Sequence, residues 1–142
     1  MSIHSAIVVF FLAFNFSPSS NHSINVEVTG LRTSDGDVVI SIYNRSDYFP
    51  KSEAKYKYKV ARVKVANKQV KYSFKDLPQG AYAVAIYHDE NASGEFDSNF
   101  VGYPLEGYGF SKNFKPRFSA PEFKDVSFDL QEDKLIAIKM LY

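Results

Sequence analysis

The sequence predicts an all-β fold, an antiparallel sandwich of about seven strands with one long aromatic loop. Three observations predict it. Apolar and polar residues alternate with a period near two along several short segments. The chain holds 10 Tyr and 13 Phe, and these residues favour the pleated, half-buried surface of a strand. No segment shows the amphipathic period of a helix of ordinary length, so a helical fold is not expected.

The first residues differ from the rest of the chain. Residues 6–16, AIVVFFLAFNF, carry no charge, and the run is too short to cross a bilayer, which needs about 20 apolar residues. It fits the apolar core of a secretory signal peptide, and the alternative is a buried first strand. We therefore expect residues 1–21 to be a signal peptide and residues 22–142 to form a single β-sandwich domain. The mature protein is then periplasmic or secreted and has no membrane span.

Short turns separate the alternating segments. INVEVTGL and VVISIY flank SDGD, which predicts a first hairpin with a turn at Asp35 and Gly36. YKVARVKV and QVKYSF flank ANK, which predicts a second hairpin. A further strand is expected over residues 81–88, after a corner at Pro78 and Gly80. DVSFDL and KLIAIKMLY, on either side of QED, complete a fold whose strands mostly pair with their neighbours in sequence.

In KYKYKV, residues 55–60, lysines alternate with aromatic and apolar residues. The pattern is typical of an edge strand whose lysines face water and discourage pairing with another chain. A basic, aromatic surface for an anionic partner is the alternative interpretation of the same segment.

Composition excludes several classes of function. The formal net charge is +1, too small for general nucleic-acid binding, which requires a strongly basic surface. The absence of cysteine excludes thiol catalysis and thiolate metal sites. His4 and His22 lie in or beside the predicted signal peptide, which leaves His88 as the one histidine well inside the domain and excludes a histidine-rich zinc site.

Two resemblances follow from longer segments. SFKDLPQGAYAVAIY resembles the corner and strand of prealbumin-like or carboxypeptidase-regulatory-like sandwiches, and the matching residues are Phe74, Leu77, Pro78, Gly80 and Tyr82. VTGLRTSDGDVVISIYN, LPQGAYAVAIYHDENASGEFDSNF and EGYGFS resemble, in the same order, the blocks of a bacterial family, domain of unknown function 2141. The first resemblance implies an immunoglobulin- or prealbumin-like sandwich. The second implies an exported bacterial protein and brings no established activity.

The segment HDENASGEFDSNF gathers acids and amides directly after a predicted strand. Its spacing matches an EF-hand calcium loop, with oxygen-bearing side chains at positions one, three and five, glycine at six and a carbonyl at seven. These positions fall on Asp89, Asn91, Ser93, Gly94 and Glu95, and Asp97 is at position nine. Position twelve, which needs a bidentate Glu, is Phe100, so we expect Glu106 to complete the shell from the long loop.

Calcium is the ion expected at residues 89–97, because it accepts many oxygen ligands in flexible geometry. Few carboxylates are present, so binding should be weak, with a Kd of about 10⁻⁴–10⁻³ M as in extracellular modules. Without the ion the carboxylates would crowd one loop, so removing Asp89 should cost the calcium-free protein little. The alternative is an acidic turn held by Asx hydrogen bonds.

The long segment 102–118 carries the aromatic residues Tyr103, Tyr108, Phe110, Phe114 and Phe118. Segments this long without regular structure are often functional. The aromatic side chains would either bind a protein, peptide or glycan partner or cap one end of the sandwich.

The sequence as a whole predicts an exported, non-enzymatic sandwich module with a weak calcium-binding loop and an aromatic loop able to bind a partner. Two alternatives stay open. One is a small hydrolase or isomerase on a prealbumin-like scaffold that uses His88, although adjacent strand residues point to opposite faces and His88 would not pair with Asp89. The other is a purely structural envelope protein.

Overall fold

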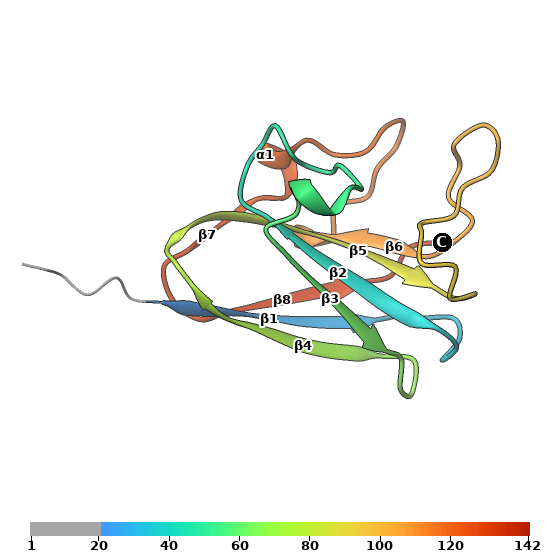
Figure 1. The fold of residues 1–142 in the computed structure, drawn as a ribbon, viewed down its shortest axis with the longest axis horizontal. Helices are drawn as coiled ribbons and strands as arrows, with labels where there is room; N and C mark the ends of the chain where they lie inside the picture. Colours follow the sequence, from blue (N-terminus) through green and yellow to red (C-terminus); the bar gives the residue numbers. More distant parts are fainter. Residues whose placement is uncertain (1–20) are drawn as a thin grey trace, which may run out of the picture.

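The computed structural model describes residues 21–142 and consists of two β-sheets packed face to face (Figure 1). The three-stranded sheet has the order β4 (Val70–Leu77), β1 (His22–Thr29), β8 (Lys134–Lys139). The five-stranded sheet has the order β3 (Lys59–Lys64), β2 (Asp37–Tyr43), β5 (Gly80–Asp89), β6 (Tyr108–Phe110), and β7 (Phe128–Leu130) pairs with the start of β5. The predicted all-β sandwich is confirmed.

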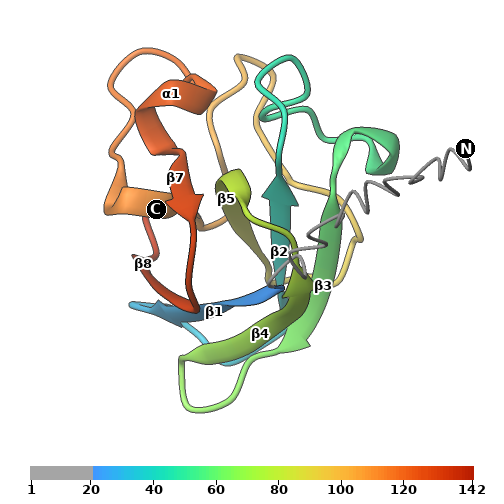
Figure 2. The same ribbon diagram turned by 90° about the vertical axis from the view of Figure 1, so that its left-hand side faces the viewer.

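The described residues also include three short helices: η1 (Ala54–Tyr56), η2 (Ser111–Asn113) and α1 (Phe123–Val126). Figures 1 and 2 show α1 on the side of the five-stranded sheet that faces away from β1, β4 and β8. We call this side the outer face. Among residues 21–142, no helix is long and apolar enough to span a membrane. The signal-peptide prediction falls almost entirely on residues 1–20, which lie outside the described part of the chain.

Alternate residues of the strands fill the space between the sheets. In β1 and β2 the inward-facing residues are Ile24, Val26 and Val28 and Val38, Ile40 and Ile42, all at most 1% exposed. This is the period of two that the sequence shows, since successive strand residues point to opposite faces. Burying each such side chain stabilises the fold by about 1.5–3 kcal/mol.

A second, smaller core covers part of the outer face. Phe49 lies at its centre, with its ring centroid 5.1 Å from that of Tyr43 and 6.1 Å from those of Phe110 and Phe123, all in edge-on arrangements. β2 is therefore buried on both of its faces. The groove described below lies beside this core on the outer face and shares Tyr43 and Phe110 with it.

The predicted hairpins are wrong. β1 pairs antiparallel with β4 and parallel with β8, and β2 pairs with β3 and β5, so the turn at Asp35 and Gly36 carries the chain from one sheet to the other. The second predicted hairpin joins β3 to β4 across the two sheets, with a single bridge between Ala66 and Gln69. Turn residues specify where the chain reverses, whereas the apolar faces of the strands decide which sheet each strand joins.

The basic segment 55–60 is a strand only at its end. β3 begins at Lys59 and is an edge strand, as predicted, whereas η1 occupies the start of the segment. Lys57 follows η1 in extended backbone and is half-buried. Its side chain therefore does not follow the alternation of the edge strand.

Candidate functional site

The acidic loop begins at the last residue of β5, Asp89, whose side chain is fully buried. Its Oδ2 accepts hydrogen bonds from Arg62 Nη1 at 2.7 Å and from the backbone N–H of Gly94 at 3.0 Å, and its Oδ1 accepts one from the N–H of Ser93 at 2.9 Å. Burial by itself would raise the pKa of Asp89, but the Arg62 guanidinium and the two amides outweigh burial and hold the pKa below its usual value. The charged carboxylate thus fixes the turn of the loop.

Glu106, from the long segment 102–118, is also buried and contacts the loop backbone. Its Oε1 accepts a hydrogen bond from the N–H of Glu90 at 3.1 Å, and its Oε2 accepts one from the N–H of Asp97 at 3.2 Å. Burial, the largest influence, raises the pKa of Glu106. The long loop therefore does fold back, and it binds the backbone at both ends of the acidic loop.

The remaining loop residues bond to one another. Asn91 Nδ2 donates to Asp97 Oδ2 at 2.7 Å, Asn91 Oδ1 accepts from the N–H of Ser93 at 3.0 Å, and Ser93 Oγ donates to the carbonyl of Glu95 at 3.1 Å. Among residues 21–142, no group of three or more acidic or histidine side chains is placed to hold a metal ion. A calcium ion at Asp89 would have to displace Arg62 and the backbone amides, so calcium binding stays a prediction for experiment.

His88 points into the sandwich and is fully buried. Its Nε2 lies 2.7 Å from the carbonyl of Asp35 and its Nδ1 lies 3.2 Å from the Tyr142 hydroxyl, while Glu90 Oε1 is 3.7 Å from Nδ1. A carbonyl only accepts, so Nε2 carries the proton, and in the neutral ring the Tyr142 hydroxyl donates to Nδ1. His88 and Asp89 lie on opposite faces of β5, as the alternation of a strand requires. Both ring nitrogens are thus engaged within the fold.

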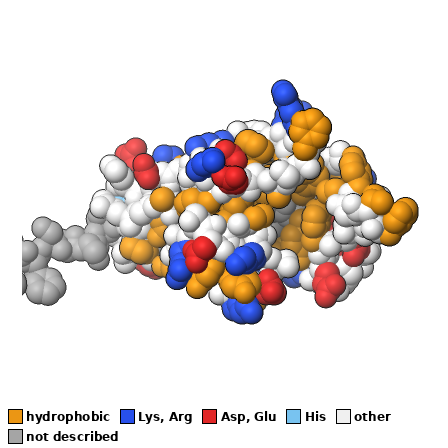
Figure 3. Space-filling view, turned by 90° about the horizontal axis from the view of Figure 1, so that it is seen from above, with side chains coloured by type: hydrophobic (Ala, Val, Ile, Leu, Met, Phe, Trp, Pro, Cys, Tyr) orange, Lys and Arg blue, Asp and Glu red, His pale blue; other side chains and the backbone are white. Residues whose placement is uncertain are grey.

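A groove of about 780 Å³ lies on the outer face of the five-stranded sheet. Outward-facing residues of three neighbouring strands form its floor: Ser41 and Tyr43 of β2, Ala85 and Tyr87 of β5, and Tyr108 and Phe110 of β6. Residues of three connections form its walls: Pro50, Ser52 and Lys57; Phe96, Val101, Gly102, Tyr103 and Pro104; and residues 116–120. Figure 3 looks onto this face, and hydrophobic side chains gather along the hollow between these connections. The volume lies within the range of ligand-binding pockets, about 300–1,000 Å³.

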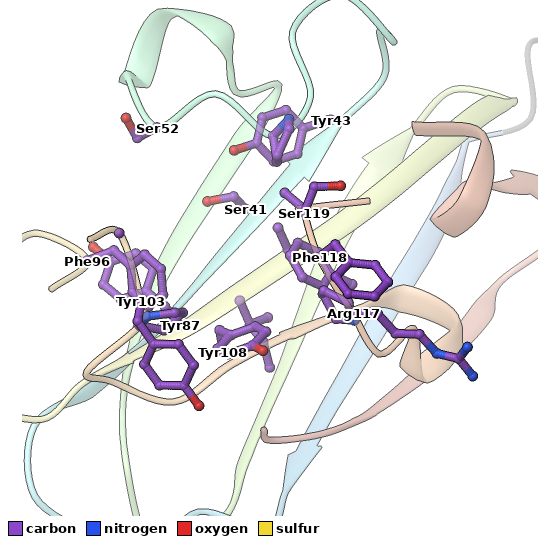
Figure 4. A pocket seen from close by; sticks show the side chains of 18 of the residues that line it. Ser41, Tyr43, Ser52, Tyr87, Phe96, Tyr103, Tyr108, Arg117, Phe118 and Ser119 are labelled. Carbon is purple, nitrogen blue, oxygen red and sulfur yellow. The ribbon is translucent and has the colours of Figure 1, made fainter. Parts of the chain in front are cut away.

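Aromatic side chains dominate the groove. Figure 4 shows Tyr87, Phe96 and Tyr103 along one side and Phe118 along the other. Phe118 is fully exposed and Tyr103 is 62% exposed, so both rings present open faces at the rim. Phe114, in contrast, packs into the second core. Part of segment 102–118 therefore packs against the sandwich, and part of it lines the groove.

The sequence prediction missed the part of the groove that strands provide. Tyr43 of β2 and Tyr87 of β5 line it, and Phe96 and Lys57 of the connections were missed as well. A signal for the strand residues was present, since AYAVAIY and VVISIY are apolar on both faces and a strand with two apolar faces is covered on both sides. Lys57 lies in the segment 55–60, for which a basic, aromatic surface was the alternative interpretation.

Comparison with known proteins places the chain in a family. The family model for an uncharacterized protein conserved in bacteria (DUF2141) matches residues 26–137, well over half of the chain. The chain belongs to this family. The resemblance found in the strand and loop segments is thereby confirmed. No curated protein and no solved structure matches the chain. The DUF2141 match includes the acidic loop and every segment that lines the groove.

Proposed function

We propose that the protein is an exported, non-enzymatic module that binds a partner through its aromatic groove. The observation that carries this proposal is the concentration of seven aromatic residues in one open groove of about 780 Å³. Binding pockets are concave and mostly apolar, with a few polar groups that orient the ligand. The groove has this character, since its floor also carries the hydroxyl groups of Ser41, Tyr87 and Tyr108.

The exposed rings at the rim support the same proposal. Leaving Phe118 and Tyr103 in water forgoes burial that is worth about 1.5–3 kcal/mol for a large apolar side chain. Exposed apolar patches on stable domains commonly mark interaction sites. A purely structural envelope protein would not need open aromatic rings around a groove.

The enzyme alternative has less support from the geometry. A catalytic histidine must reach a proton of the substrate, and the side chain of His88 has no exposed surface. His88 also lies on the inner face of β5, whereas the groove is on the outer face. His88→Ala should therefore leave partner binding unchanged, and a substrate turnover that His88→Ala abolishes in a folded protein would overturn the proposal.

Binding through the groove is tested with a pair of phenylalanine variants. Phe118 and Phe100 are both fully exposed, but only Phe118 lines the groove. The protein is screened against arrays of peptides and glycans, and the affinity of each hit is measured by calorimetry. We expect Phe118→Ala to weaken binding by about 10- to 100-fold, the effect of losing an aromatic anchor. Phe100→Ala should leave the affinity unchanged, and equal effects of the two variants would contradict groove binding.

Export is tested independently of binding. Mass spectrometry of the native protein from the periplasm or medium should find its N-terminus between about residues 19 and 24. A mature protein that retains Met1 would contradict a cleaved signal peptide.

A further inference from the structure

The charges of the groove are all of one sign. Its charged lining residues are Lys57 and Arg117, both cationic, and no acidic residue among those described lines it. Arg117 is exposed and Figure 4 shows its side chain pointing away from the aromatic rings, so it is a cation of the rim. Lys57 is half-buried in the wall. The electrostatics of the groove therefore favour an anionic ligand.

Lys57 differs from the other lysines of its neighbourhood. Lys59 donates to the carbonyl of Lys75 at 3.0 Å, and the ammonium groups of Lys51 and Lys55 lie over the ring of Tyr56. Within residues 21–142, the ammonium group of Lys57 has no hydrogen-bond or ion-pair partner. Burial lowers the pKa of Lys57, which means that its charge is partly desolvated without compensation. An anionic group of a ligand would supply the missing partner.

The floor of the groove limits how a ligand can be held. It is the face of the sheet: β2 pairs with β3 and β5, β5 pairs with β2 and β6, and the edge strand β6 is bridged at Tyr108 to Leu141 on its other side. A peptide that lies on this face cannot be added as a further strand, because strands are added at the edge of a sheet and not on its face. Recognition must rely on aromatic rings and hydroxyl groups. Flat rings at the rim with hydroxyl groups between them suit the C–H faces and hydroxyl groups of sugar rings.

We infer that the groove binds an acidic oligosaccharide, a chain of sugar rings that bear carboxylates. Tyr103 and Phe118 stack on sugar rings, the hydroxyl groups of the floor bond to sugar hydroxyl groups, and Lys57 pairs with a carboxylate. This inference rests on the proposed function, since it names the class of ligand for the same groove. It also assigns an anion-binding role to Lys57, which belongs to the basic segment 55–60 that the sequence mainly predicted to be a solvent-facing edge.

The test compares ligands that differ in charge and in class. Oligogalacturonate is the acidic probe, its methyl ester is the neutral analogue of the same rings, and an oligoglutamate peptide carries carboxylates without sugars. Calorimetry with the purified protein should detect oligogalacturonate, with an affinity at least about tenfold above that for the ester or the peptide. Added salt should weaken this binding, because the ion pair at Lys57 is only partly shielded from solvent.

Variants separate the charge of Lys57 from its packing. Lys57→Met keeps an unbranched chain and removes the charge, and it should weaken oligogalacturonate binding by about 10- to 100-fold, the range for a lost charge-assisted hydrogen bond. Lys57→Arg should retain most of the affinity. Lys55→Met removes a charge outside the groove from the same segment and should bind as the wild type does. Thermal melts should show Lys57→Met at least as stable as the wild type, since the variant removes an unpaired, half-buried charge.

Each other result overturns part of the argument. Equal affinity for oligogalacturonate and its methyl ester would show that the charge of Lys57 does not contribute to binding. Unchanged affinity of Lys57→Met would show the same. Tighter binding of the peptide than of the sugar shows that the ligand class is wrong. Absence of any binding of oligogalacturonate at millimolar concentration also overturns the inference. A different result would overturn the proposed function itself: ligands of every class on the arrays would bind Phe118→Ala and the wild type equally well.

Discussion

Replacing Asp89 with Ala, in the presence of a calcium chelator, tests what holds the acidic loop in place. The carboxylate is fully buried and accepts three hydrogen bonds, one of them from the Arg62 guanidinium at 2.7 Å. A hydrogen bond to a charged group contributes about 1.5–3 kcal/mol, and the lower part of that range applies because the Arg62 side chain is 40% exposed. The amides of Ser93 and Gly94 add about 1 kcal/mol together, since water can replace the carboxylate there. The expected loss is about 2–3 kcal/mol.

The assay is urea unfolding in chelator, followed by circular dichroism and extrapolated to water. At about 4 °C per kcal/mol for a domain of this size, the melting temperature should fall by about 10 °C. Asp97→Ala is the matched control, because the Asp97 side chain accepts a single bond from an exposed residue, Asn91. We expect that control to lose less than about 1 kcal/mol. Equal stability of Asp89→Ala and wild type would refute the reasoning and favour a loop that needs calcium, in which an unpaired carboxylate is dispensable without the ion.

Three further predictions concern pH, calcium and backbone packing. The fold holds the pKa of Asp89 below its usual value, so the contribution of Asp89 to stability is fully present above the unfolded pKa of about 3.9 and is lost as pH falls through the lower folded pKa. In urea titrations, the stability difference between wild type and Asp89→Asn should therefore shrink below about pH 4. A difference that stays constant with pH would count against the Arg62 contact. If residues 89–97 bind calcium, scanning calorimetry should show that the free energy of unfolding rises by about 2.7 kcal/mol when free calcium is a hundredfold above Kd. Identical melting temperatures in chelator and in about 10 mM calcium would exclude the expected affinity. Gly36→Ala should destabilise the protein by more than about 3 kcal/mol, because an added Cβ would lie 1.9 Å from the backbone carbonyl oxygen of Asp89. Gly94→Ala, also at positive φ but with open space around it, should cost only about 1 kcal/mol. Similar melting temperatures for the two variants would show that the crossing at Gly36 is less tightly packed.

The layers of the fold could be predicted from the sequence, whereas the pairing of the strands could not. The alternation in INVEVTGL and VVISIY identifies strands and their buried faces with no knowledge of the partners. The turn at Gly36 has the residues of a hairpin, but its backbone crosses to the other sheet and packs against Asp89. That contact joins residues far apart in the chain, so no local pattern reports it.

The candidate site divides in the same way. The acidic loop, and its interpretation as a turn held by Asx hydrogen bonds, could be predicted because the backbone N–H groups of Ser93 and Gly94 bond to side chains a few residues away. Arg62 could not be predicted as the partner of Asp89, because it lies on β3 and reaches across β2 to β5. The groove was missed for a related reason, since its floor is formed by outward positions of three strands that meet only in the folded sheet.

The acidic loop and the groove are parts of one structure. Phe96 belongs to the loop, and its ring lies 5.5 Å from that of Tyr87 and 6.3 Å from that of Tyr108, both on the floor of the groove. The bonds that Asp89 and Glu106 make to the loop backbone therefore also set the position of Phe96 in the groove wall. The dense run of oxygen-bearing side chains after β5 then has a role that needs no ion: it fixes a short, polar loop tightly enough to hold an aromatic ring against the sheet. In the proposed function, Asp89 and Glu106 hold one wall of the groove in position, whereas the aromatic rings and Lys57 contact the ligand.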